Sequence, residues 1–391
     1  MYSLSLLYCI TLSIQLLNKT TTPAMPKVTF DNKNAVFFTG LKKEVDQYFV
    51  DHKVKKTGNY ELYLKTAVLI PASVAMYCAI LLVTMPVWLL VVLSAVLGLA
   101  LASIGFNVMH DACHGSYSSK KWVNELLGYT INTLGGNAFI WKQKHNIIHH
   151  TYVNVDGLDD DIAKSPLIRQ CHTQKWVPAH QVQHLYLPLV YAITSFAWAF
   201  IMDFTKYFTN RVYRTPLQKM SAWDHIIFWF SKVMYVVAYV VVPYYFLGGA
   251  MFAVFFCVMH YFKGTALALV FQLAHVVEET EFETVATDDK VIENEFAIHQ
   301  VRTTANFAMD NTLINWYVGG LNYQIEHHLF PRISHVHYPA LSPIVRKHCA
   351  MHNITYNNNP TMVGAIASHW RFMKELGKRP ADMSVATSSL F

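Results

Sequence analysis

Two apolar runs in the first third of the chain constrain its fold more than any other feature. Residues 66–84 and 87–109 contain no charged side chain and are separated only by Met85 and Pro86. A helix rises about 1.5 Å per residue, and roughly 20 apolar residues cross the ~30 Å hydrocarbon core of a bilayer. Each run is therefore long enough to span a membrane, and the short connection predicts that the two form a hairpin.

A second pair of apolar runs follows at 225–247 and 250–274, joined by Gly248 and Gly249. Two lysines interrupt these otherwise apolar segments. The composition also indicates membrane insertion, since 53% of the 391 residues are hydrophobic and only 14% are charged. We predict an all-α integral membrane protein with four transmembrane helices in two hairpins and a cytosolic helical cap.

The chain contains no Gly/Ser/Pro-rich linker or low-complexity segment that would divide it. We expect an N-terminal leader and cytosolic segment over residues 1–59, a membrane domain over 60–350 and a cytosolic tail over 351–391. Residues 1–24 lack the basic start of a signal peptide, so they are interpreted as an upstream start or a leader. The formal charge of +6 is mild, and no basic and aromatic stripe predicts nucleic-acid binding.

The distribution of charge predicts the side of the membrane that each segment occupies. The turns within the two pairs are uncharged, whereas the long connecting segments carry many basic residues, including Lys142 and Lys144. Because basic residues are enriched on the cytoplasmic side, the termini and the long middle segment are predicted to be cytoplasmic. His110 and His275, which end the two pairs, then emerge on the same cytoplasmic face.

A further apolar stretch, residues 185–202, is also long enough to cross a membrane. If it crossed, the chain after it would be inverted, and His110 and His275 would lie on opposite sides. We therefore expect this stretch to lie in the membrane interface or against the cytosolic layer.

Twenty histidines occur in the chain, and many of them gather in three short motifs. HDACH places His110 and His114 four residues apart, which on a helix brings both rings to one face. HNIIHH repeats this spacing and adds a third ring, and QIEHH supplies an adjacent pair. A lone histidine is often structural, but three clusters on one side of the membrane predict a metal centre. The candidate ligands are His110, His114, His145, His149, His150, His275, His327 and His328.

The ligand types indicate which metal would bind. Zinc sites usually need three or four ligands and often include cysteine, whereas here seven or eight imidazoles are available. The six cysteines are scattered without C-x-x-C spacing, so neither a thiolate cluster nor a disulfide framework is indicated, and we expect a reducing compartment. So many nitrogen ligands suit two redox-active iron ions, because imidazole resists the oxidation that destroys a thiolate.

In this order, HDACH, HNIIHH and QIEHH resemble the three histidine boxes of the membrane fatty acid desaturases. The flanking segments NVDGLDDDI and LFPRISHVHYPAL strengthen the resemblance, which covers roughly residues 60–350. Glutamine as the first residue of the third box is similar to the front-end and linoleoyl-CoA-type acyl desaturases. The resemblance implies an enzyme that introduces a cis double bond into an acyl chain carried by coenzyme A or by a lipid.

The resemblance also implies two iron ions, O2 as co-substrate and electrons from another protein. It assigns the eight histidines as iron ligands and puts Gln324 where many relatives have a histidine, so that Gln324 would ligate weakly or act through water. Front-end enzymes often carry a fused haem domain marked by His-Pro-Gly-Gly, and this motif does not occur here. The electrons would therefore come from a separate ferredoxin or cytochrome b5.

Several other residues are candidates for supporting roles. Trp141 is interpreted as a packed interfacial tryptophan or as a wall of the substrate channel. His335 and His337 are expected at the surface or near a head group. Lys263 either extends its amine toward water or contacts an acidic substrate group. The carboxylates that could orient the imidazoles are Asp111, Asp159, Asp160, Asp161, Glu278 and Glu326.

Two other classes of protein share part of this pattern. A related di-iron membrane hydroxylase of an alkane, sterol or carotenoid would use a similar set of boxes, although QIEHH followed by LFP favours the desaturase. A histidine-lined metal transporter would need ligands along a path through the bilayer, whereas these clusters are predicted to lie at one surface.

Overall fold

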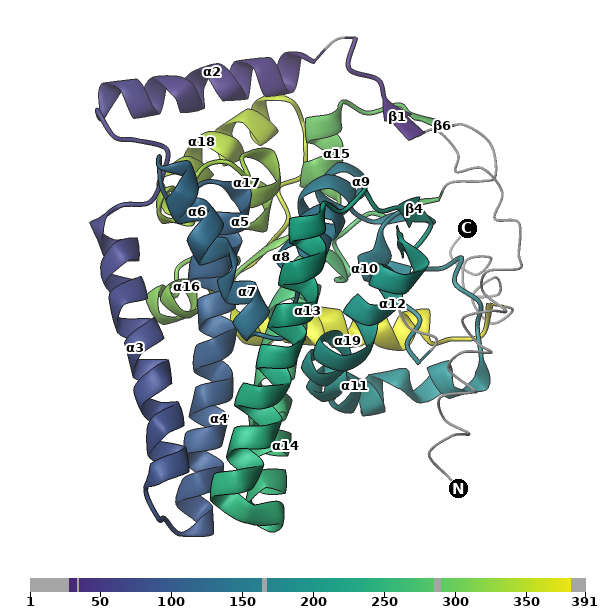
Figure 1. The fold of residues 1–391 in the computed structure, drawn as a ribbon. Coiled ribbons are helices and arrows are strands. Elements are labelled where there is room, and N and C mark those ends of the chain that lie inside the picture. Colours follow the sequence, from purple (N-terminus) through teal and green to yellow (C-terminus); the bar gives the residue numbers. More distant parts are fainter. Residues whose placement is uncertain (1–27, 34, 164–166, 285–289, 381–391) are drawn as a thin grey trace.

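The computed structural model describes residues 28–33, 35–163, 167–284 and 290–380. It is mostly helical, and Figure 1 shows a bundle of long helices below a layer of shorter helices and small strand pairs. Within this described part, four helical segments are long and apolar enough to cross a membrane. They are Tyr60–Leu82, Val87–His114, Pro178–Thr209 and Ala222–His275.

The first long helix, α3 (Tyr60–Leu82), starts earlier than the apolar run at 66–84 because a polar residue caps it. The side chain of Asn59 accepts hydrogen bonds from the backbone N–H groups of Glu61 and Leu62 at 3.0 and 3.3 Å. The helix ends before Val83, whose backbone is extended. A short connection therefore joins α3 to the next helix, as the sequence predicts.

The second long helix carries the first histidine motif at its end. α4 (Val87–Ile104) follows Pro86 and continues through a π-helical stretch, η1 (Gly105–Met109), into α5 (His110–His114). Gly115 ends it in the left-handed conformation, with φ 73°. A π-helical turn widens the helix and is frequent at functional sites, and here it directly precedes the first two candidate ligands.

The segment Ala222–His275 consists of two helices. α13 (Ala222–Val236), the π-helical η5 (Val237–Val241) and the start of α14 (Val242–His275) run to Gly248, where φ 73° and ψ 169° break the helix. Figure 1 shows the chain turning back between α13 and α14 at the lower end of the bundle, beside the turn between α3 and α4.

Two glycines let helices of the bundle touch backbone to backbone. A Cβ atom on Gly98 of α4 would lie 2.5 Å from the carbonyl oxygen of Met259, and one on Gly264 would lie 2.5 Å from that of Ala192. Real Cβ atoms do not approach so closely, and small residues are how membrane helices achieve such contact. α14 is therefore held against α4 on one side and against the Ala192 helix on the other.

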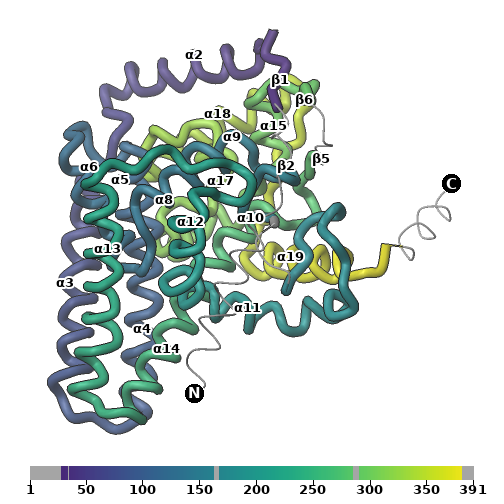
Figure 2. Tube along the Cα trace, turned by 45° about the vertical axis from the view of Figure 1, so that its right-hand side comes forward, coloured from purple at the N-terminus to yellow at the C-terminus, as the bar shows by residue number. Residues whose placement is uncertain are grey.

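The apolar stretch 185–202 lies within the segment Pro178–Thr209, which is indeed long and apolar enough to span a membrane. Figures 1 and 2 show its central helix, α11, running across the direction of α3, α4 and α13 rather than alongside them. The parts of the segment are the 3-10 helix η3 (Pro178–Val182), α11 (Gln183–Ala197), the π-helical η4 (Trp198–Met202) and α12 (Asp203–Thr209).

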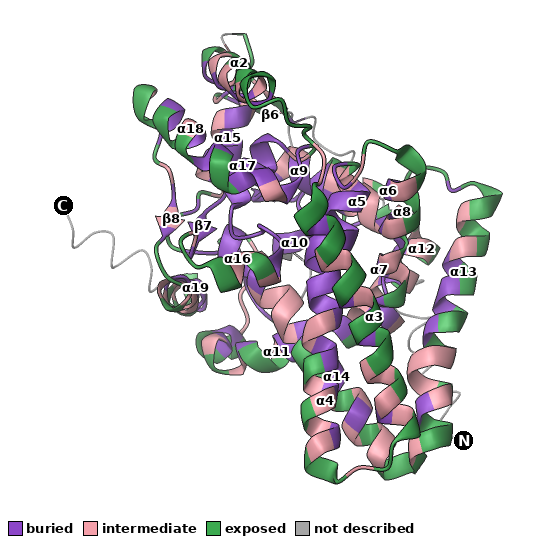
Figure 3. Cartoon of the chain, turned by 90° about the vertical axis from the view of Figure 1, so that its left-hand side faces the viewer, coloured by how far each residue is buried: buried purple, intermediate pink, exposed green. Residues whose placement is uncertain are grey.

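The remaining helices are mostly short, and most of them lie above the bundle in Figure 1. Figure 3 shows buried residues concentrated in α5, α10 and α17, whereas the long helices carry many exposed residues. The remaining helices outside the four long segments are α2 (Val36–Asp51), α6 (Lys121–Gly128), α7 (Thr130–Thr133), α8 (Ala138–Lys142), the π-helical η2 (Gln143–His149), α9 (His150–Tyr152), α10 (Asp160–Ala163), α15 (Phe296–Arg302), α16 (Thr312–Val318), α17 (Gln324–Leu329), the 3-10 helix η6 (His335–His337), α18 (Tyr338–Met351) and α19 (Met362–Leu376).

Short strand pairs connect segments that are far apart in the sequence. Three of these pairs are parallel, and the pair of Arg211–Val212 with Thr215–Pro216 is antiparallel. They join β1 (Val28–Phe30) to β6 (Lys290–Ile292), β2 (Val155–Asp156) to β5 (Glu283–Thr284), β3 (Arg211–Val212) to β4 (Thr215–Pro216) and β7 (Asn306–Phe307) to β8 (Asn358–Asn359).

Both ends of the described chain pack against the layer above the bundle. Helix α2 buries Phe37, Leu41, Val45 and Phe49, which recur every four residues and form one apolar face against α18. At the other end, α19 buries Met373 and Leu376 against residues of α11. These contacts enclose the segments that carry the histidines.

The close contact at Gly98 generates a stability prediction. Gly98→Ala should lower the Tm of the detergent-solubilised protein by several degrees, because the added methyl group forces α4 away from the Met259 carbonyl and overpacking costs about 1–3 kcal/mol. Gly249→Ala is the matched control, since its Cβ would meet Tyr244 at an ordinary 3.9 Å. Equal Tm values for the two variants would contradict the backbone contact.

Candidate metal centre

The candidate ligands come from four separate segments that converge above the bundle. His110 and His114 lie on α5, and His275 is the last residue of α14. The π-helical η2 and the short α9 carry the histidines of the second motif, and α17 carries those of the third. All eight histidines that the sequence singled out are brought together, and all but the slightly exposed His114 are buried.

One group of ring nitrogens joins all three motifs. Nitrogen atoms of His110, His114, His145 and His327 all lie within 4.8 Å of one another. The Nε2 atom of His110 is 3.2 Å from Nε2 of His145, which in turn is 3.3 Å from Nε2 of His150. Nitrogens bound to one metal ion at about 2.0–2.1 Å would be separated by distances of this order.

A second group lies beside the first. Nitrogen atoms of His149, His275 and His328 are within 4.8 Å of one another, and His150 forms a further group with His327 and His328. His327 also belongs to the first group and His328 to the second, so these adjacent residues and His150 connect the two groups. The arrangement offers two adjoining positions for metal ions.

The outer nitrogens of the rings are hydrogen-bonded, which fixes their orientation. His327 Nδ1 is 3.1 Å from the Tyr338 hydroxyl, and His328 Nδ1 is 2.9 Å from Oε1 of Gln300. His149 Nδ1 is 3.1 Å from Oδ2 of Asp159. Partners of this kind orient metal-binding imidazoles.

The inner nitrogens fit metal ligation. Nε2 of His114, His275, His327 and His328 is buried and has no hydrogen-bond partner among the described residues. A buried nitrogen left without a partner is unfavourable. Metal ions bound at the two groups would give each of these four nitrogens a partner. The residues present therefore fit a pair of ions, and the absence of thiolates and the abundance of imidazole suit iron.

Burial also keeps these rings in the form that binds metal. Desolvation, reinforced by the neighbouring histidines, holds the pKa values of His145, His150, His327 and His328 well below the usual range. The rings are consequently neutral at physiological pH, and a neutral ring has a nitrogen lone pair for a metal ion.

Gln324 begins α17 and is 3% exposed. Its side chain lines the same cavity as His110 and His145. Gln324 thus lines the same cavity as two candidate ligands, and its role toward a metal ion stays a prediction.

The candidate carboxylates divide into those that contact the histidines and those that do not. Asp159 accepts hydrogen bonds from the Asn154 backbone at 3.0 Å as well as contacting His149. Asp161 lies 3.6 Å from His149 and 2.6 Å from Lys144. Asp160 is paired instead with a lysine of α12 at 3.2 Å. Asp159 and Asp161 are thus the carboxylates placed to orient the second motif.

Asp111 and Glu326 brace the histidine motifs from behind. Asp111 accepts a hydrogen bond from Ser334 Oγ at 2.6 Å and lies 3.0 Å from His335 Nδ1, which ties α5 to the segment after the third motif. Glu326 accepts hydrogen bonds from Tyr356 at 2.7 Å and from Asn306. Its carboxylate therefore holds the C-terminal segment against α17.

Other expectations need correction. His335 and His337 are buried, not at the surface, because the segment after the third motif folds back onto Asp111 and onto the backbone oxygen of Thr57. Lys263 neither extends toward water nor lines the cavity, since its amine is buried and donates to Leu134 O and to the Tyr235 hydroxyl. Glu278 pairs with an arginine of α19 at the surface.

The partners of the third motif escaped sequence reasoning. Tyr338 lies in the quoted segment that follows QIEHH, so its position was a usable signal. Gln300 lies on α15, and nothing in its sequence neighbourhood distinguishes it.

A cavity of about 390 Å³ reaches the histidines. Its wall includes the polar residues His110, His145 and Gln324. Apolar residues of η1, α11 and α14 form much of the remaining wall. Trp141 lines it as well and stacks on His145, with ring centroids 4.4 Å apart. Trp141 is therefore a wall of the cavity, as one of the two interpretations of this residue proposed.

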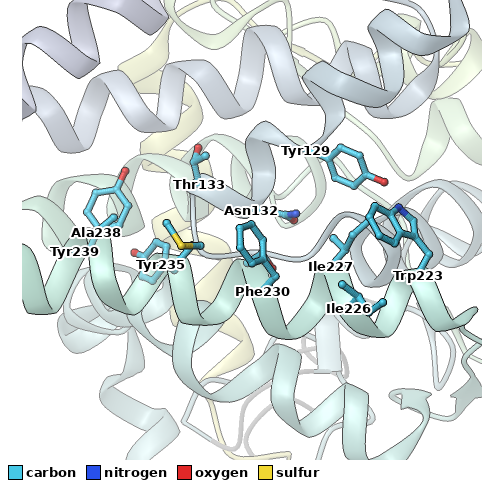
Figure 4. Close-up of a pocket in the computed structure, with 12 residues that line it drawn as sticks. Tyr129, Asn132, Thr133, Trp223, Ile226, Ile227, Phe230, Tyr235, Ala238 and Tyr239 are labelled. Atoms are coloured by element: carbon cyan, nitrogen blue, oxygen red, sulfur yellow. The ribbon is translucent and has the colours of Figure 1, made fainter.

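A second hollow, of about 690 Å³, lies between α7 and α13 (Figure 4). Trp223 and Phe230 of α13 line it together with Tyr129, and its described lining includes no histidine. Trp223 is 63% and Phe230 66% exposed. This hollow is thus an outward-facing groove on a helix apolar enough to span a membrane, separate from the cavity at the metal centre.

Long apolar helices, a dense cluster of imidazoles and an adjoining apolar cavity are consistent with a membrane protein that can hold metal ions among its histidines. The fatty acid desaturase family model matches residues 86–360, and the chain belongs to this family. It is 33% identical to the sn-1 linoleoyl-lipid 6-desaturase of Arthrospira platensis, over 93% of this chain and 98% of that protein. A Synechocystis protein of the same name is 34% identical over 90% of this chain and 98% of its own length.

A more distant relative, the acyl-lipid (8-3)-desaturase of Physcomitrium patens, is 31% identical over 89% of this chain and 73% of its own length. The resemblance stated on the three histidine motifs is thereby confirmed, including its front-end character.

The lowered pKa values predict how stability depends on pH. As pH falls below about 6.5, histidines of the unfolded chain take up protons, whereas the buried rings of the folded protein do not. The metal-free protein should therefore hold a constant Tm above about pH 7 and lose stability as pH decreases through 6.5. His150→Gln removes one such group, so the Tm of this variant should fall less steeply with decreasing pH. A Tm independent of pH down to about 5 would contradict the neutral, buried state of the rings.

Proposed function

We propose that the protein is an O2-dependent acyl desaturase that uses two iron ions to introduce a cis double bond into an acyl chain. The observation that carries the proposal is the convergence of eight imidazoles, seven of them buried, beside an apolar cavity, with the inner nitrogens of four rings unpartnered among the described residues. Membership of the fatty acid desaturase family supports the same activity.

The grouping of the rings suggests how the ions would be held. His110, His114, His145 and His327 would bind one ion, and His149, His275 and His328 the other. His150 lies against both groups through His145 and His328, so it would serve either ion. Gln324 would complete the first ion's surroundings weakly or through water.

Bound iron would supply, with O2, the oxidising power to remove hydrogen from an alkyl chain, which no side-chain base can do. The protein contributes position. The apolar cavity excludes water, and the Trp141 ring, stacked on His145, would limit where a methylene can lie. Asp159 and Asp161 hold the second motif in the orientation that ligation requires.

Two hairpins are proposed to cross the membrane, with α3 and α4 as the first and α13 and α14 as the second. Support comes from the two turns, which lie at the same end of the bundle in Figure 1. The membrane domain would extend over residues 60–350, flanked by cytosolic segments at 1–59 and 351–391. The layer that carries the histidines would then be a cytosolic cap, with the active site on the cytoplasmic side.

The helix α11 is proposed to lie at the membrane interface. Its direction across the bundle in Figures 1 and 2 supports this, as does its contact with α14 at Gly264. A crossing there would carry His275 to the opposite side from His110, although their groups of histidines adjoin.

The electron donor and the acyl carrier are proposed on separate grounds. As the resemblance to desaturases implies, the two electrons are proposed to come from another protein, a ferredoxin or a cytochrome b5. The curated relatives are named for acyl chains carried by lipids. We therefore propose an acyl group esterified in a membrane glycerolipid as the substrate, in preference to acyl-CoA.

The alternatives predict other products or another arrangement of ligands. A hydroxylase of an alkane, sterol or carotenoid could use the same cluster, and product analysis separates it from a desaturase. A metal transporter would spread its ligands along a path through the bilayer, whereas these rings form one buried cluster.

Fatty-acid analysis tests the activity. A host expressing the protein should contain a new unsaturated fatty acid, detected by gas chromatography and mass spectrometry. His149→Ala should abolish it, because the second group of ligands loses a ring. His52→Ala, at an exposed position on the N-terminal side of α3, should retain the activity. A hydroxylated product would identify an oxygenase of the alternative class, and an unchanged profile with iron-loaded protein and a donor would refute desaturation.

Asp159 offers a test of ligand orientation. Asp159→Asn keeps an oxygen near His149 but removes the negative charge, so iron affinity should fall about 10- to 100-fold. Iron content after dialysis against graded chelator measures this loss. The control is Asp46→Asn, whose carboxylate pairs with Lys42 and Lys56 at the surface. Equal iron retention in both variants would show that Asp159 does not support the site.

A further inference from the structure

Two glutamines form a hydrogen-bonded pair in the wall of the cavity. Gln170 Nε2 donates to Gln272 Oε1 at 2.8 Å, and both side chains line the cavity. Gln170 is 2% and Gln272 8% exposed. Among the described residues, Gln272 bonds to Gln170 through Oε1, so its Nε2 keeps its hydrogens for a group in the cavity. The pair therefore offers a hydrogen-bond donor to a polar group on the substrate.

Several other polar side chains of the wall are already occupied. Lys144 and Lys206 are paired with Asp161 and Asp160, at 2.6 and 3.2 Å. The hydroxyl of Thr194 donates to a carbonyl of its own helix at 3.0 Å. The uncharged glutamine pair is therefore better suited than these residues to bind a neutral group.

The position of the pair relates the outside of the cavity to the metal centre. Gln272 lies on α14, one helical turn before His275. Gln170 follows Leu167, which lines the cavity and is 54% exposed, and Ile193 of α11 lines it and is 44% exposed. The wall of the cavity thus contains the glutamine pair, partly exposed apolar residues and the candidate ligands His110 and His145.

A saturated stretch of acyl chain has no feature by which a protein can count its methylenes, and the nearest polar group is the carbonyl at its end. A hydrogen bond to that carbonyl would fix how many methylenes separate it from the metal centre. Gln272 Nε2 has hydrogen atoms available for such a bond, and Gln170 holds the Gln272 amide in place through Oε1.

We propose that Gln272, positioned by Gln170, donates a hydrogen bond to the ester carbonyl of the lipid-linked acyl chain and thereby sets the position of the double bond. The proposal rests on the acyl-lipid substrate inferred above. It makes Gln272 a specificity-determining residue of the desaturase.

The test compares lipid binding with and without the carbonyl. Wild-type protein in detergent should bind dilinoleoyl phosphatidylcholine about tenfold more tightly than its ether-linked analogue, which lacks the carbonyl, because a buried donor left unpaired loses a full hydrogen bond. Gln272→Met keeps the length of the side chain and should bind ester and ether equally. Gln170→Met should give an intermediate ratio, and the control Thr194→Val, also in the cavity wall, should retain the wild-type ratio.

Product analysis provides the second readout. Gln272→Met should spread the double bond over neighbouring positions, whereas wild-type protein and Thr194→Val should give one position, with Tm and iron content unchanged in all three. An ester-to-ether ratio that Gln272→Met leaves unchanged would overturn the proposal. So would a variant that keeps one double-bond position but alters the preference between saturated and unsaturated chains, since the pair would then recognise the chain. If wild-type protein makes no double bond, desaturation fails, and the binding ratio still decides the role of Gln272.

Discussion

The structure depends on bringing eight imidazole rings close together, seven of them buried. Rings at this density would repel one another if they were protonated, and burial alone makes the charged form unfavourable. The fold supplies what the rings require, with hydrogen bonds on their outer nitrogens and unpartnered nitrogens on the inside. The rest of the cap can be understood as the support for that arrangement, since carboxylates, a tyrosine and a glutamine stand behind the rings.

Much of this arrangement could be predicted from the sequence. Long apolar runs identified α3, α4, α13 and α14, because hydrocarbon thickness and helical rise are fixed quantities. Spacing at i and i+4 paired His110 with His114 and His145 with His149, and the other four rings followed from their adjacent places in the motifs or, for His275, from the end of an apolar run.

Other features could not be predicted, because they depend on contacts between distant segments. The burial of His335 results from a chain reversal that brings it to Asp111, over 200 positions away in the sequence. Gln300 reaches His328 only once α15 packs against α17. The π-helical stretch that carries His145 and His149 has no recognised signature, although it alters which residues share a face. Lys263 illustrates the same limit, since its backbone partner at Leu134 is visible only in three dimensions.

The hydrogen bonds of Glu326 have a consequence for how the enzyme is made. Box three is braced by Tyr356 and Asn306, and β7 pairs with β8 near the end of the chain. The chain must therefore be translated at least to Asn359 before the third motif acquires its final surroundings, whereas the first two motifs leave the ribosome well before that point. A metal ion that needs all three motifs would accordingly bind only after this last segment has been made.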